Sequence, residues 1–368
     1  MRFLFIIPCF ESGKDGVGDY TRRLIGAVES LPPASHECRV VGWNDTWVSD
    51  FTQSCTVLRL PSSWNEARKV KCFNTWLADW QPDAVSLQWV PFGYHARGLF
   101  VRQIASFSRA LAPWPLQIMV HETWVGAKKG STRKEQLLGW LQRRWFRQLV
   151  HRLQPRCVHT QAKAYQYLLA QQGIPSELLP LFGNIDPVTD VPPRPITQLR
   201  CGCFGALHPE FDIEPLIEPL RKLADELGRE LVLLHAGRMG ADACSRWQFW
   251  QERWKGRVQF QALGEQSEAE ISRYLFSLDF GISSNPLSLV DKSGSIAAML
   301  DHGLPVINIR DDVRFEGFFP ETDRTMMLHR PTIETLRAAL QRSHAPVELN
   351  SLEWIARRFV EVFASGNA

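Results

Sequence analysis

The sequence lacks the short motifs that identify many catalytic and metal sites. It contains no Cys-x-x-Cys pair, no His-Glu-x-x-His segment, no Walker A loop and no Ser-His-Asp order. Its eight cysteines are scattered, and only Cys201 and Cys203 are close neighbours. These absences argue against a zinc site and a disulfide framework. We therefore expect no metal, no bound cofactor and a reducing, cytoplasmic compartment.

Long apolar runs and a large excess of one charge are also missing. No apolar run approaches the length that spans a bilayer, and the apolar N-terminus MRFLFIIPCF is short and stopped by Pro8, as in a first buried strand. The net charge is +3, whereas nucleic-acid-binding domains usually carry a clear basic excess. We expect a protein that binds no nucleic acid and touches the inner face of a membrane at most.

Apolar and charged residues are present in globular proportions, 45% and 22% of 368 residues, enough for two domains. Residues 186–195, DPVTDVPPRP, hold four prolines and no helical or strand period, as in a semi-rigid linker. We predict a first domain at 1–186, a linker at 187–198, a second domain at 199–350, and a C-terminal helix at 351–368 that packs back on the first domain.

Short apolar runs alternate with segments of helical period in both halves, the pattern of a parallel sheet covered by helices on both faces. In the first half we predict strands at 2–7, 40–43, 55–60, 84–89, 116–120 and 157–159 and helices at 18–29, 65–80, 98–111, 132–153 and 162–172. In the second half we predict strands at 200–204, 230–236, 258–260, 279–282 and 304–309 and helices at 214–227, 241–254, 267–276, 333–342 and 352–363, with one more between Ser295 and Gly303. Two doubly wound, Rossmann-like α/β domains would face each other across a ligand cleft.

The small-residue turn Lys292-Ser293-Gly294-Ser295 opens a helix in the second half. The free N–H groups and positive dipole end of such a helix suit a phosphate or diphosphate, and Lys292 adds a mobile charge. The alternative is that Ser293 is only an N-cap and Gly303 only a C-cap.

Glycines follow the first predicted strand in the segment ESGKDGVG. Gly13, Gly16 and Gly18 do not follow the G-x-G-x-x-G order of a dinucleotide site, which weakens a hydride-transfer function. They still let a ligand approach the backbone closely, with Asp19 at the start of the next helix. The alternative is a flexible turn that Asp19 caps.

Other candidates stand at predicted strand ends. His121, followed by Glu122, can donate to a sugar hydroxyl or phosphate or accept a proton, or else be structural. Gly205 allows close approach of the backbone. Arg238 can bind phosphate or form a surface ion pair. Leu263 and Gly264 stand instead in the loop before the helix predicted at 267–276, where their backbone can contact the edge of a base.

The predicted helix at 133–150 carries Arg143, Arg144 and Arg147 beside Trp140, Trp145 and Phe146. A basic, aromatic amphipathic helix can lie on an anionic membrane, in which case the acceptor would be lipid-linked. The alternative is a core-packed helix with a solvated basic face.

Taken in order, these segments resemble the GT-B glycosyltransferases, and more closely the retaining, nucleotide-sugar-dependent enzymes of family 4. The resemblance rests on GVGDYTRRL from Gly16, on His121-Glu122, on LPLFGNID from Leu179, on FGAL, HAGR and LGEQSEAEIS, and on KSGSIAAMLDHGLPVI from Lys292. It implies a donor nucleotide-sugar held mainly by the second domain and a carbohydrate or lipid-linked acceptor held mainly by the first. The family's glycine loop maps onto Gly16 and Gly18, its strand-end histidine near the transferred sugar onto His121, and its turn before the last nucleotide-binding helix onto Ser293-Gly294-Ser295.

Two departures from the family pattern are clear. Ala206 stands where the family usually keeps an arginine, and Val290 and Ala298 lie near the positions of its two glutamates. Our hypothesis is that Lys292, with Arg238, neutralises the diphosphate instead. The reaction would transfer a sugar to an acceptor hydroxyl in bacterial polysaccharide, glycolipid or glycoconjugate synthesis.

If the reaction retains configuration, the leaving phosphate can assist deprotonation of the acceptor. If it inverts configuration, Asp19 or His121 is the candidate base. The alternatives are a nucleotide-sugar 2-epimerase, a catalytically inactive nucleotide-sugar-binding protein and, third, a dehydrogenase.

Overall fold

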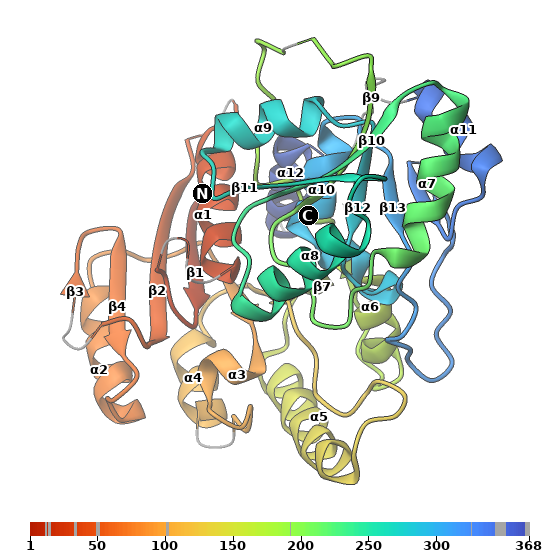
Figure 1. Cartoon of the computed structure of the whole chain (residues 1–368). Coiled ribbons are helices and arrows are strands. Elements are labelled where there is room, and N and C mark those ends of the chain that lie inside the picture. The colour runs from red at the N-terminus through yellow and green to blue at the C-terminus, as the bar shows by residue number, and fades with distance from the viewer. Residues whose placement is uncertain are drawn as a thin grey trace. The chain divides into compact units, whose positions relative to one another are not determined.

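The computed structural model describes residues 1–364 except 12, 14–15, 33–34, 49–51, 101–102, 192, 325 and 343–350. The chain forms two compact units. The first comprises Met1–Pro180, Phe315–Phe318 and Ser351–Ala368, and the second comprises Leu181–Arg314 and Phe319–Asn350. Each unit is built on one mainly parallel sheet with helices around it (Figure 1), as the alternation in the sequence predicts.

The first unit has an eight-stranded sheet over its described residues, in the order β3-β4-β2-β1-β5-β6-β7-β8. Neighbouring strands are parallel except the antiparallel edge pair β3–β4. Its elements are β1 (Arg2–Ile7), α1 (Gly16–Glu29), β2 (Glu37–Asp45), β3 (Thr52–Gln53), β4 (Val57–Pro61), α2 (Glu66–Trp76), β5 (Ala84–Trp89), α3 (Pro91–Tyr94), α4 (Gln103–Leu111), β6 (Leu116–Val120), α5 (Arg133–Leu153), β7 (Cys157–Thr160), α6 (Lys163–Ala170), β8 (Glu177–Leu178) and α12 (Leu352–Ala364).

The two faces of this sheet have separate aromatic cores. Phe3 and Phe5 of β1 pack against Phe359 of α12 with ring centroids 5.4 Å apart in both pairs. On the opposite face, Trp43 packs against Phe107 at 4.5 Å. Because successive side chains of a strand point to opposite faces, the apolar run of β1 supplies both cores.

The second unit has a seven-stranded sheet over its described residues, in the order β11-β10-β9-β12-β13-β15-β14. β14 and β15 form its antiparallel edge pair. Its elements are β9 (Gln198–Phe204), α7 (Glu214–Glu226), β10 (Glu230–Ala236), α8 (Ala241–Arg253), β11 (Gln259–Gly264), α9 (Glu268–Phe276), β12 (Phe280–Ser283), the 3-10 helix η1 (Leu287–Lys292), α10 (Gly294–Asp301), β13 (Val306–Asn308), β14 (Asp323–Arg324), β15 (Met327–His329) and α11 (Ile333–Arg342).

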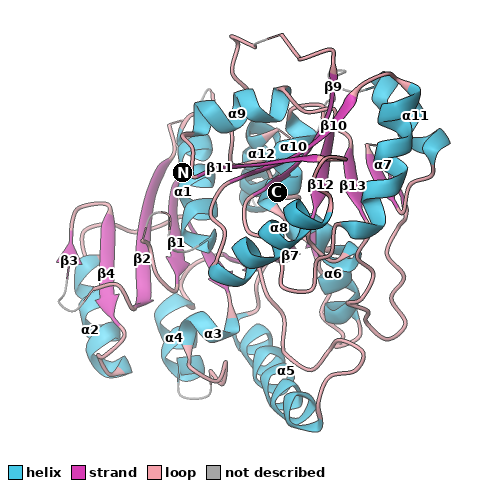
Figure 2. Cartoon of the chain, viewed as in Figure 1, coloured by secondary structure: helices cyan, strands magenta, loops and turns pink. Residues whose placement is uncertain are grey.

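Both faces of the second sheet are covered by helices (Figure 2). Leu231 and Leu233 of β10 join a core with α7, α8 and α11. Val232 and Leu234 join another core with α9 and α10. The near-continuous apolar run of this strand therefore reflects burial on both sides.

Residues 187–198, which the prolines predict as a linker, belong to the second unit, and the chain leaves the first unit between Pro180 and Leu181. Val188 N donates to Ser272 Oγ at 2.9 Å, and Asp190 pairs with Arg273 at 2.7 Å. Proline composition indicates a segment without helix or strand, but it does not say which domain that segment packs against. Residue 192 of this segment and residues 343–350 of the predicted second domain lie outside the described residues.

Some predicted bounds also differ from the structure. α1 begins at Gly16, two residues earlier than predicted, and α2 ends at Trp76 instead of residue 80. Of the helix predicted at 98–111, the described helical residues are Gln103–Leu111, and 101–102 lie outside the described residues. β3, α3, β8, η1, β14 and β15 were not predicted, because runs of two to six residues carry too little periodicity. No helix among the described residues is long and apolar enough to cross a membrane.

Candidate functional site

The strand order of the second sheet reverses at β9, between β10 and β12. In doubly wound sheets, ligands bind outside the carboxyl ends of the strands at this switch point. Gly205 directly follows β9, Gly237 follows β10, and Gly264 ends β11. The predicted Gly205 and Gly264, together with Gly237, thus lie at the edge of the sheet where a ligand is expected.

These three glycine loops pack directly on one another. Gly205 N donates to Ala236 O at 2.9 Å, and Gly237 N donates to Gly264 O at 2.8 Å. All three glycines have positive φ, and a Cβ on Gly237 would lie 3.1 Å from the Gly205 Cα. Side chains at these positions would be strained or crowded, so the chain presents bare backbone here.

His235 of the HAGR segment forms a hydrogen bond to the first of these glycine loops. Its side chain is fully buried, and its Nε2 hydrogen-bonds Gly205 O at 2.7 Å. Burial lowers the pKa of His235, so the neutral ring donates to the carbonyl. We infer that this histidine positions the glycine loop.

The amino end of α10 is capped by Ser293. Its Oγ accepts from Ile296 N at 3.3 Å and from Asn285 Nδ2 at 2.9 Å, and it lies 3.0 Å from Ser295 Oγ. The N-cap alternative considered for Ser293 is therefore present in the structure. Because the cap satisfies one donor of the first turn, the Gly294 and Ser295 backbone and the Ser295 hydroxyl are the groups best suited to an anion.

Lys292 and Asn184 flank this turn. Lys292 is the half-buried last residue of η1, directly before the cap, so the predicted irregular turn begins as a 3-10 helix. A Cβ on Gly294 would lie 3.8 Å from Asn184 Oδ1, and a Cβ on Gly205 would lie 3.9 Å from Ser295 Cβ. The structure thus brings Gly205, Ser293-Gly294-Ser295 and the GNID segment together within the second unit.

Arg238 forms a bidentate ion pair with Glu265, with both N–O distances at 2.9 Å, and its side chain is 72% exposed. The hydrogen bonds from Arg238 lower the pKa of Glu265. An exposed, solvent-screened pair of this kind contributes little to stability, so a diphosphate could displace Glu265. Leu263 and Gly264 lie immediately before this glutamate, and Leu263 is exposed.

Arg310 was missed by sequence reasoning, although it follows the strand predicted at 304–309. It is buried, donates to Ser284 O at 2.8 Å and forms a fork with both carboxylate oxygens of Asp312. It therefore fixes the loop after β12 at the same edge of the sheet. Because Asp312 neutralises the charge of Arg310, Arg310 attracts an anionic ligand only weakly.

In the first unit, the glycine loop differs from the predicted one. Gly13 has a φ of 67°, whereas Gly16 and Gly18 lie inside the first turn of α1. Asp19 Oδ1 accepts from Gly13 N at 3.1 Å, so Asp19 caps the loop, which is the alternative noted for it. Ser12, Lys14 and Asp15 of this loop lie outside the described residues.

His121 follows β6 and is buried, with its ring edge-on to Tyr20 of α1 at a centroid distance of 4.9 Å. Its Nε2 lies 2.8 Å from Gln88 Oε1. Gln88 Nε2 donates to Ser86 Oγ, which orients the Gln88 amide so that its oxygen faces the histidine. In this arrangement Nε2 is the donor and Nδ1 carries the lone pair.

A buried hydrogen-bond chain continues from Gln88 through the sheet. Ser86 Oγ donates to Gln117 Oε1 at 2.6 Å, and Gln117 Nε2 lies 3.0 Å from His159 Nδ1. Every donor in this chain points the same way, from His121 toward His159. Such a connected network fixes the orientation of each member.

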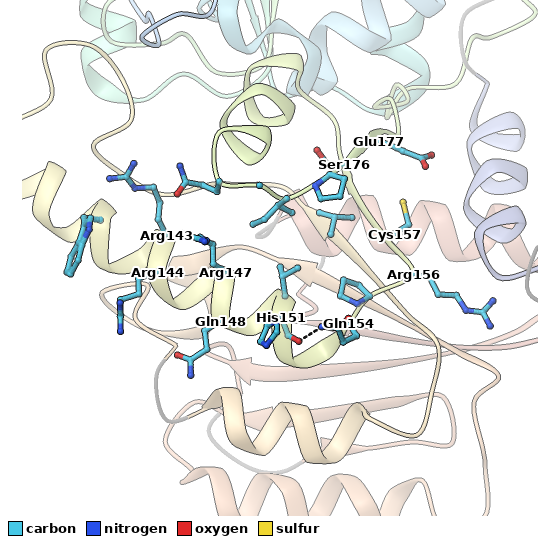
Figure 3. Close-up of a pocket in the computed structure, with 18 residues that line it drawn as sticks. Arg143, Arg144, Arg147, Gln148, His151, Gln154, Arg156, Cys157, Ser176 and Glu177 are labelled. Atoms are coloured by element: carbon cyan, nitrogen blue, oxygen red, sulfur yellow. Dashed lines mark hydrogen bonds between the residues drawn. The ribbon is translucent and has the colours of Figure 1, made fainter.

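The basic helix α5 borders a cavity of about 1010 Å³ in the first unit. Figure 3 shows Arg143, Arg144 and Arg147 projecting from α5, with Arg156 and Glu177 on neighbouring segments. The core-packed alternative holds for one face only, because Phe146 and Leu149 are buried while Leu137 and Trp140 are 63% and 51% exposed.

Cys157, His159 and Glu177 form the one group of three potential metal-ligating side chains within the described residues, with donor atoms inside 4.8 Å of one another. No spacing motif indicates it, because the pairing of β7 with β8 brings Glu177 to His159. Arg358 acts electrostatically on Cys157 and His159, and the cavity beside them is lined by four arginines. This positive surrounding disfavours a cation.

No family model matches this chain, and no curated protein matches its sequence. The fold is similar to those of solved proteins over almost the whole chain. HepE of Anabaena, solved with UDP and glucose, matches with a TM-score of 0.58 and 14% identity over 99% of this chain and 100% of its own. The UDP-GlcNAc 2-epimerase of Methanocaldococcus jannaschii matches with a TM-score of 0.53 and 10% identity over the whole length of both chains. The lipopolysaccharide outer core galactosyltransferase WaaB, in its apo form, matches with a TM-score of 0.51 and 15% identity over 99% of this chain and 97% of its own.

At these identities the likeness establishes the fold. The chain has the architecture of the GT-B glycosyltransferases and of the 2-epimerases that share it, with two Rossmann-like parallel-sheet domains. The expected fold class is thereby confirmed.

Proposed function

We propose that the protein is a glycosyltransferase that moves a hexosyl group from a nucleotide-diphosphate sugar to an acceptor hydroxyl. The observation that carries the proposal is the meeting of three bare glycine loops with the amino end of α10 at the switch point of the second sheet. The backbone N–H groups at the amino end of α10 suit a diphosphate, and the glycines let it approach the backbone closely. The whole-chain likeness to HepE, solved with UDP and glucose, supports the same ligand class.

The chemistry places negative charge on the departing diphosphate. The backbone N–H groups of Gly294 and Ser295, together with the ammonium of Lys292 directly before them, would stabilise that charge without a metal ion. Such a retaining, family 4-like reaction needs no protein nucleophile. In an inverting reaction His121 would be the base, because its Nδ1 is the acceptor nitrogen, whereas Asp19 Oδ1 already accepts from Gly13 N.

A thermal-shift panel tests the ligand class. UDP, GDP and ADP and their glucose, N-acetylglucosamine and mannose conjugates would each be added to the protein. At a concentration 100 times its Kd, a ligand that binds only the native state stabilises it by about 2.7 kcal/mol, so the matching nucleotide should raise Tm by several degrees. If no nucleotide raises Tm, the proposal is wrong.

A 2-epimerase is the second candidate, because the enzyme from M. jannaschii has the same fold. Incubation with the bound nucleotide-sugar alone separates the two. Proton NMR would show a new 2-epimer under the epimerase function and an unchanged donor under the transferase function. Binding without turnover across a broad acceptor panel would indicate an inactive binding protein.

We further propose that α5 rests on an anionic membrane that carries a lipid-linked acceptor. Arg133, Leu137, Trp140, Arg144 and Arg147 are exposed and follow the i, i+4, i+7 spacing of one helix face. Exposed apolar side chains between arginines are typical of interfacial helices.

Sedimentation with vesicles containing 30% phosphatidylglycerol tests this contact. The triple variant R143A/R144A/R147A should stay in the supernatant, and R253A/K255A/R257A on the second unit should bind like the wild type. Binding of the α5 variant equal to that of the wild type would exclude this surface.

A further inference from the structure

The cavity of about 1010 Å³ beside α5, the α5 cavity, lies at the amino ends of β7 and β8. Arg156 directly precedes β7, and Ser176 directly precedes β8. Because β6, β7 and β8 are parallel, His121, which follows β6, stands at the opposite edge of the same sheet. Doubly wound sheets bind their usual ligands at that carboxyl edge. The α5 cavity is therefore separate from the edge where His121 stands.

The charged side chains of the α5 cavity are mostly arginines. The cavity is lined by one carboxylate and four guanidinium groups, those of Glu177, Arg143, Arg144, Arg147 and Arg156. This excess of three positive charges equals the net charge of the whole chain, which is +3. A cleft lined by one sign of charge attracts ions of the opposite sign. The lining therefore favours an anion.

Three of these arginines lack the carboxylate partners that other arginines of the protein have. Arg221 and Arg337 on the second unit pair with carboxylates at 2.8 and 2.7 Å. Within the part of the chain that the structure describes, the side chains of Arg143, Arg144 and Arg147 form no ion pair and no hydrogen bond. Arg147 follows Arg143 by four residues and Arg144 by three, a spacing at which like charges on a helix repel each other. A bound anion would relieve this repulsion.

A hydroxyl group in the wall of the cavity has no partner either. Ser176 lines the cavity, and its Oγ is buried without a hydrogen-bond partner among the described residues. Figure 3 shows Ser176 on the segment that leads to Glu177, and Arg143 and Arg147 on α5. Buried hydroxyl groups are nearly always paired, because an unpaired one costs free energy. The Ser176 hydroxyl thus indicates a ligand with an acceptor atom.

The segments that carry these groups are fixed by hydrogen bonds. Ser176 O accepts from Gln166 Nε2 at 2.9 Å. Arg156 N donates to Leu116 O at 2.8 Å, and Arg156 Nη1 donates to Phe363 O at 3.2 Å. Because Ser176 and Arg156 are held in place before a ligand binds, less entropy is lost on binding.

Helix dipoles do not cancel the positive charge. α5 ends at Leu153 and α6 at Ala170, and residues just beyond both ends line the cavity. Each helix end carries about half a negative charge, whose effect is confined to the last turn. Arg143 and Arg147 lie before the last turn of α5 and carry full charges. Their guanidinium groups are therefore left for a ligand, and such groups bind phosphate through paired hydrogen bonds.

We propose that the α5 cavity binds an anion with two phosphate groups, whose oxygens accept hydrogen bonds from Arg143, Arg147 and the Ser176 hydroxyl. Two phosphates match the excess of three charges better than one, because a phosphate monoester carries about −1.5 to −2. They belong either to a soluble diphosphate or bisphosphate compound or to the headgroup of an anionic lipid. The site goes beyond the proposed transferase function and requires no nucleotide-sugar.

Isothermal titration with inorganic diphosphate tests this site. Lys292→Ala is the parent protein, because Lys292 belongs to the proposed donor site and its removal leaves the α5 cavity as the tighter diphosphate site. We expect the parent to bind one diphosphate. Adding R143Q/R147Q or Ser176→Ala should each weaken this binding about tenfold or more, since each removes a hydrogen bond to a charged group.

Two controls match these changes. R221Q/R337Q removes the same charge from the second unit, and Ser108→Ala removes a hydroxyl of the first unit that donates to Ile104 O at 2.7 Å. Both should bind diphosphate like the parent, and all variants should keep its circular dichroism.

Vesicles that contain cardiolipin, whose headgroup carries two phosphates, identify the source of the anion. If a lipid headgroup occupies the cavity, diphosphate should release the wild-type protein from the vesicles, and Ser176→Ala should sediment with them less. If the occupant is soluble, diphosphate should bind equally with and without vesicles. Either result supports the cavity as a phosphate site.

The inference is overturned if Lys292→Ala binds no diphosphate, or if R143Q/R147Q or Ser176→Ala leaves the affinity of the parent unchanged. An unchanged affinity in Ser176→Ala alone would mean that the arginines act only as diffuse surface charge. Binding by the wild type but not by Lys292→Ala would place diphosphate at the donor site alone, which would contradict this inference and support the donor proposal.

Discussion

Lys292 is the single side chain on which the donor proposal depends most. It directly precedes the Ser293 cap, where a diphosphate would meet the first turn of α10. A charged hydrogen bond contributes about 1.5–3 kcal/mol, so Lys292→Ala should weaken nucleotide-diphosphate binding about 10- to 100-fold, whereas Lys292→Arg should keep most of it. Isothermal titration with the nucleotide identified by thermal shift measures the change.

Lys255→Ala is the control for this experiment, because Lys255 lies on the same unit and pairs with Glu252 at 3.4 Å. The affinity of Lys255→Ala for the nucleotide diphosphate should equal that of the wild type. An unchanged affinity in Lys292→Ala would remove the lysine from the site and leave the helix N–H groups as the remaining anion donors.

His159, at the inner end of the polar chain, should make stability depend on pH. Burial, with a smaller effect of Arg358, lowers its pKa from 6.5 to about 4. Between these values the unfolded chain binds the proton and the native state does not, so stability is complete above about pH 6.5 and falls as the pH drops toward 4. The free energy of unfolding lost over this whole pH range is about 3 kcal/mol.

Urea unfolding at pH 7.0 and pH 4.5 would measure this loss. The facing groups are Cys157 on β7, Glu177 on β8 and Arg358 on α12. His159→Gln removes the titrating group, so its two unfolding free energies should differ by less than those of the wild type. An equal pH dependence in both proteins would assign the titration to other groups.

At the scale of the element, α5 shows how one glycine sets a packing distance. A Cβ on Gly139 would collide with Val125 O, whereas a Cβ on Gly26 in α1 would meet nothing within 4 Å. Gly139→Ala should therefore push α5 outward and lower stability by about 1–3 kcal/mol, as overpacking does. Gly26→Ala should raise stability by about 0.5–1 kcal/mol, because alanine loses less entropy in a helix.

Chemical denaturation of the two variants compares the same substitution in two helices. We expect the free energy of unfolding to fall in Gly139→Ala and to rise in Gly26→Ala. A stabilised Gly139→Ala protein would mean that α5 does not pack against the 125–126 turn as described.

Elements with strong periodicity or complete burial were predicted well. β5, β6 and β10 have the predicted bounds because they are buried on both faces and end at polar or turn residues. β14 and β15 were missed, since two- and three-residue strands exist only through pairing with each other and with β13. The early start of α1 was missed because Gly16 was assigned to the glycine loop before the helix.

At the scale of the whole molecule, the C-terminal helix belongs to the unit in which the chain begins. Phe359 of α12 packs against Phe3 and Phe5 of β1 at 5.4 Å. Phe359→Ala should destabilise the first unit by about 3–5 kcal/mol, the usual effect of removing a buried aromatic ring. Hydrogen exchange should accelerate in β1 and α1.

Amides of β10 in the second unit serve as the internal reference for that measurement. Their exchange should remain slow, because Phe359 lies in the first unit. Faster exchange in β10 with unchanged exchange in β1 would contradict the assignment of α12.

The sequence by itself determined the fold class, because the periods of burial for a buried strand and an amphipathic helix are local properties of the chain. It also placed Gly205, His121 and the Lys292–Ser295 turn at strand or helix ends, where the structure has them, whereas Gly264 ends a strand that was predicted to stop at residue 260. The tertiary structure alone decided which candidate side chains already have a partner within the protein. Arg238 forms an ion pair with Glu265, and Asp19 accepts a hydrogen bond from Gly13 N. It also revealed Arg310 and the α5 cavity, because pairing of distant strands and the packing of loops depend on contacts that no local pattern encodes.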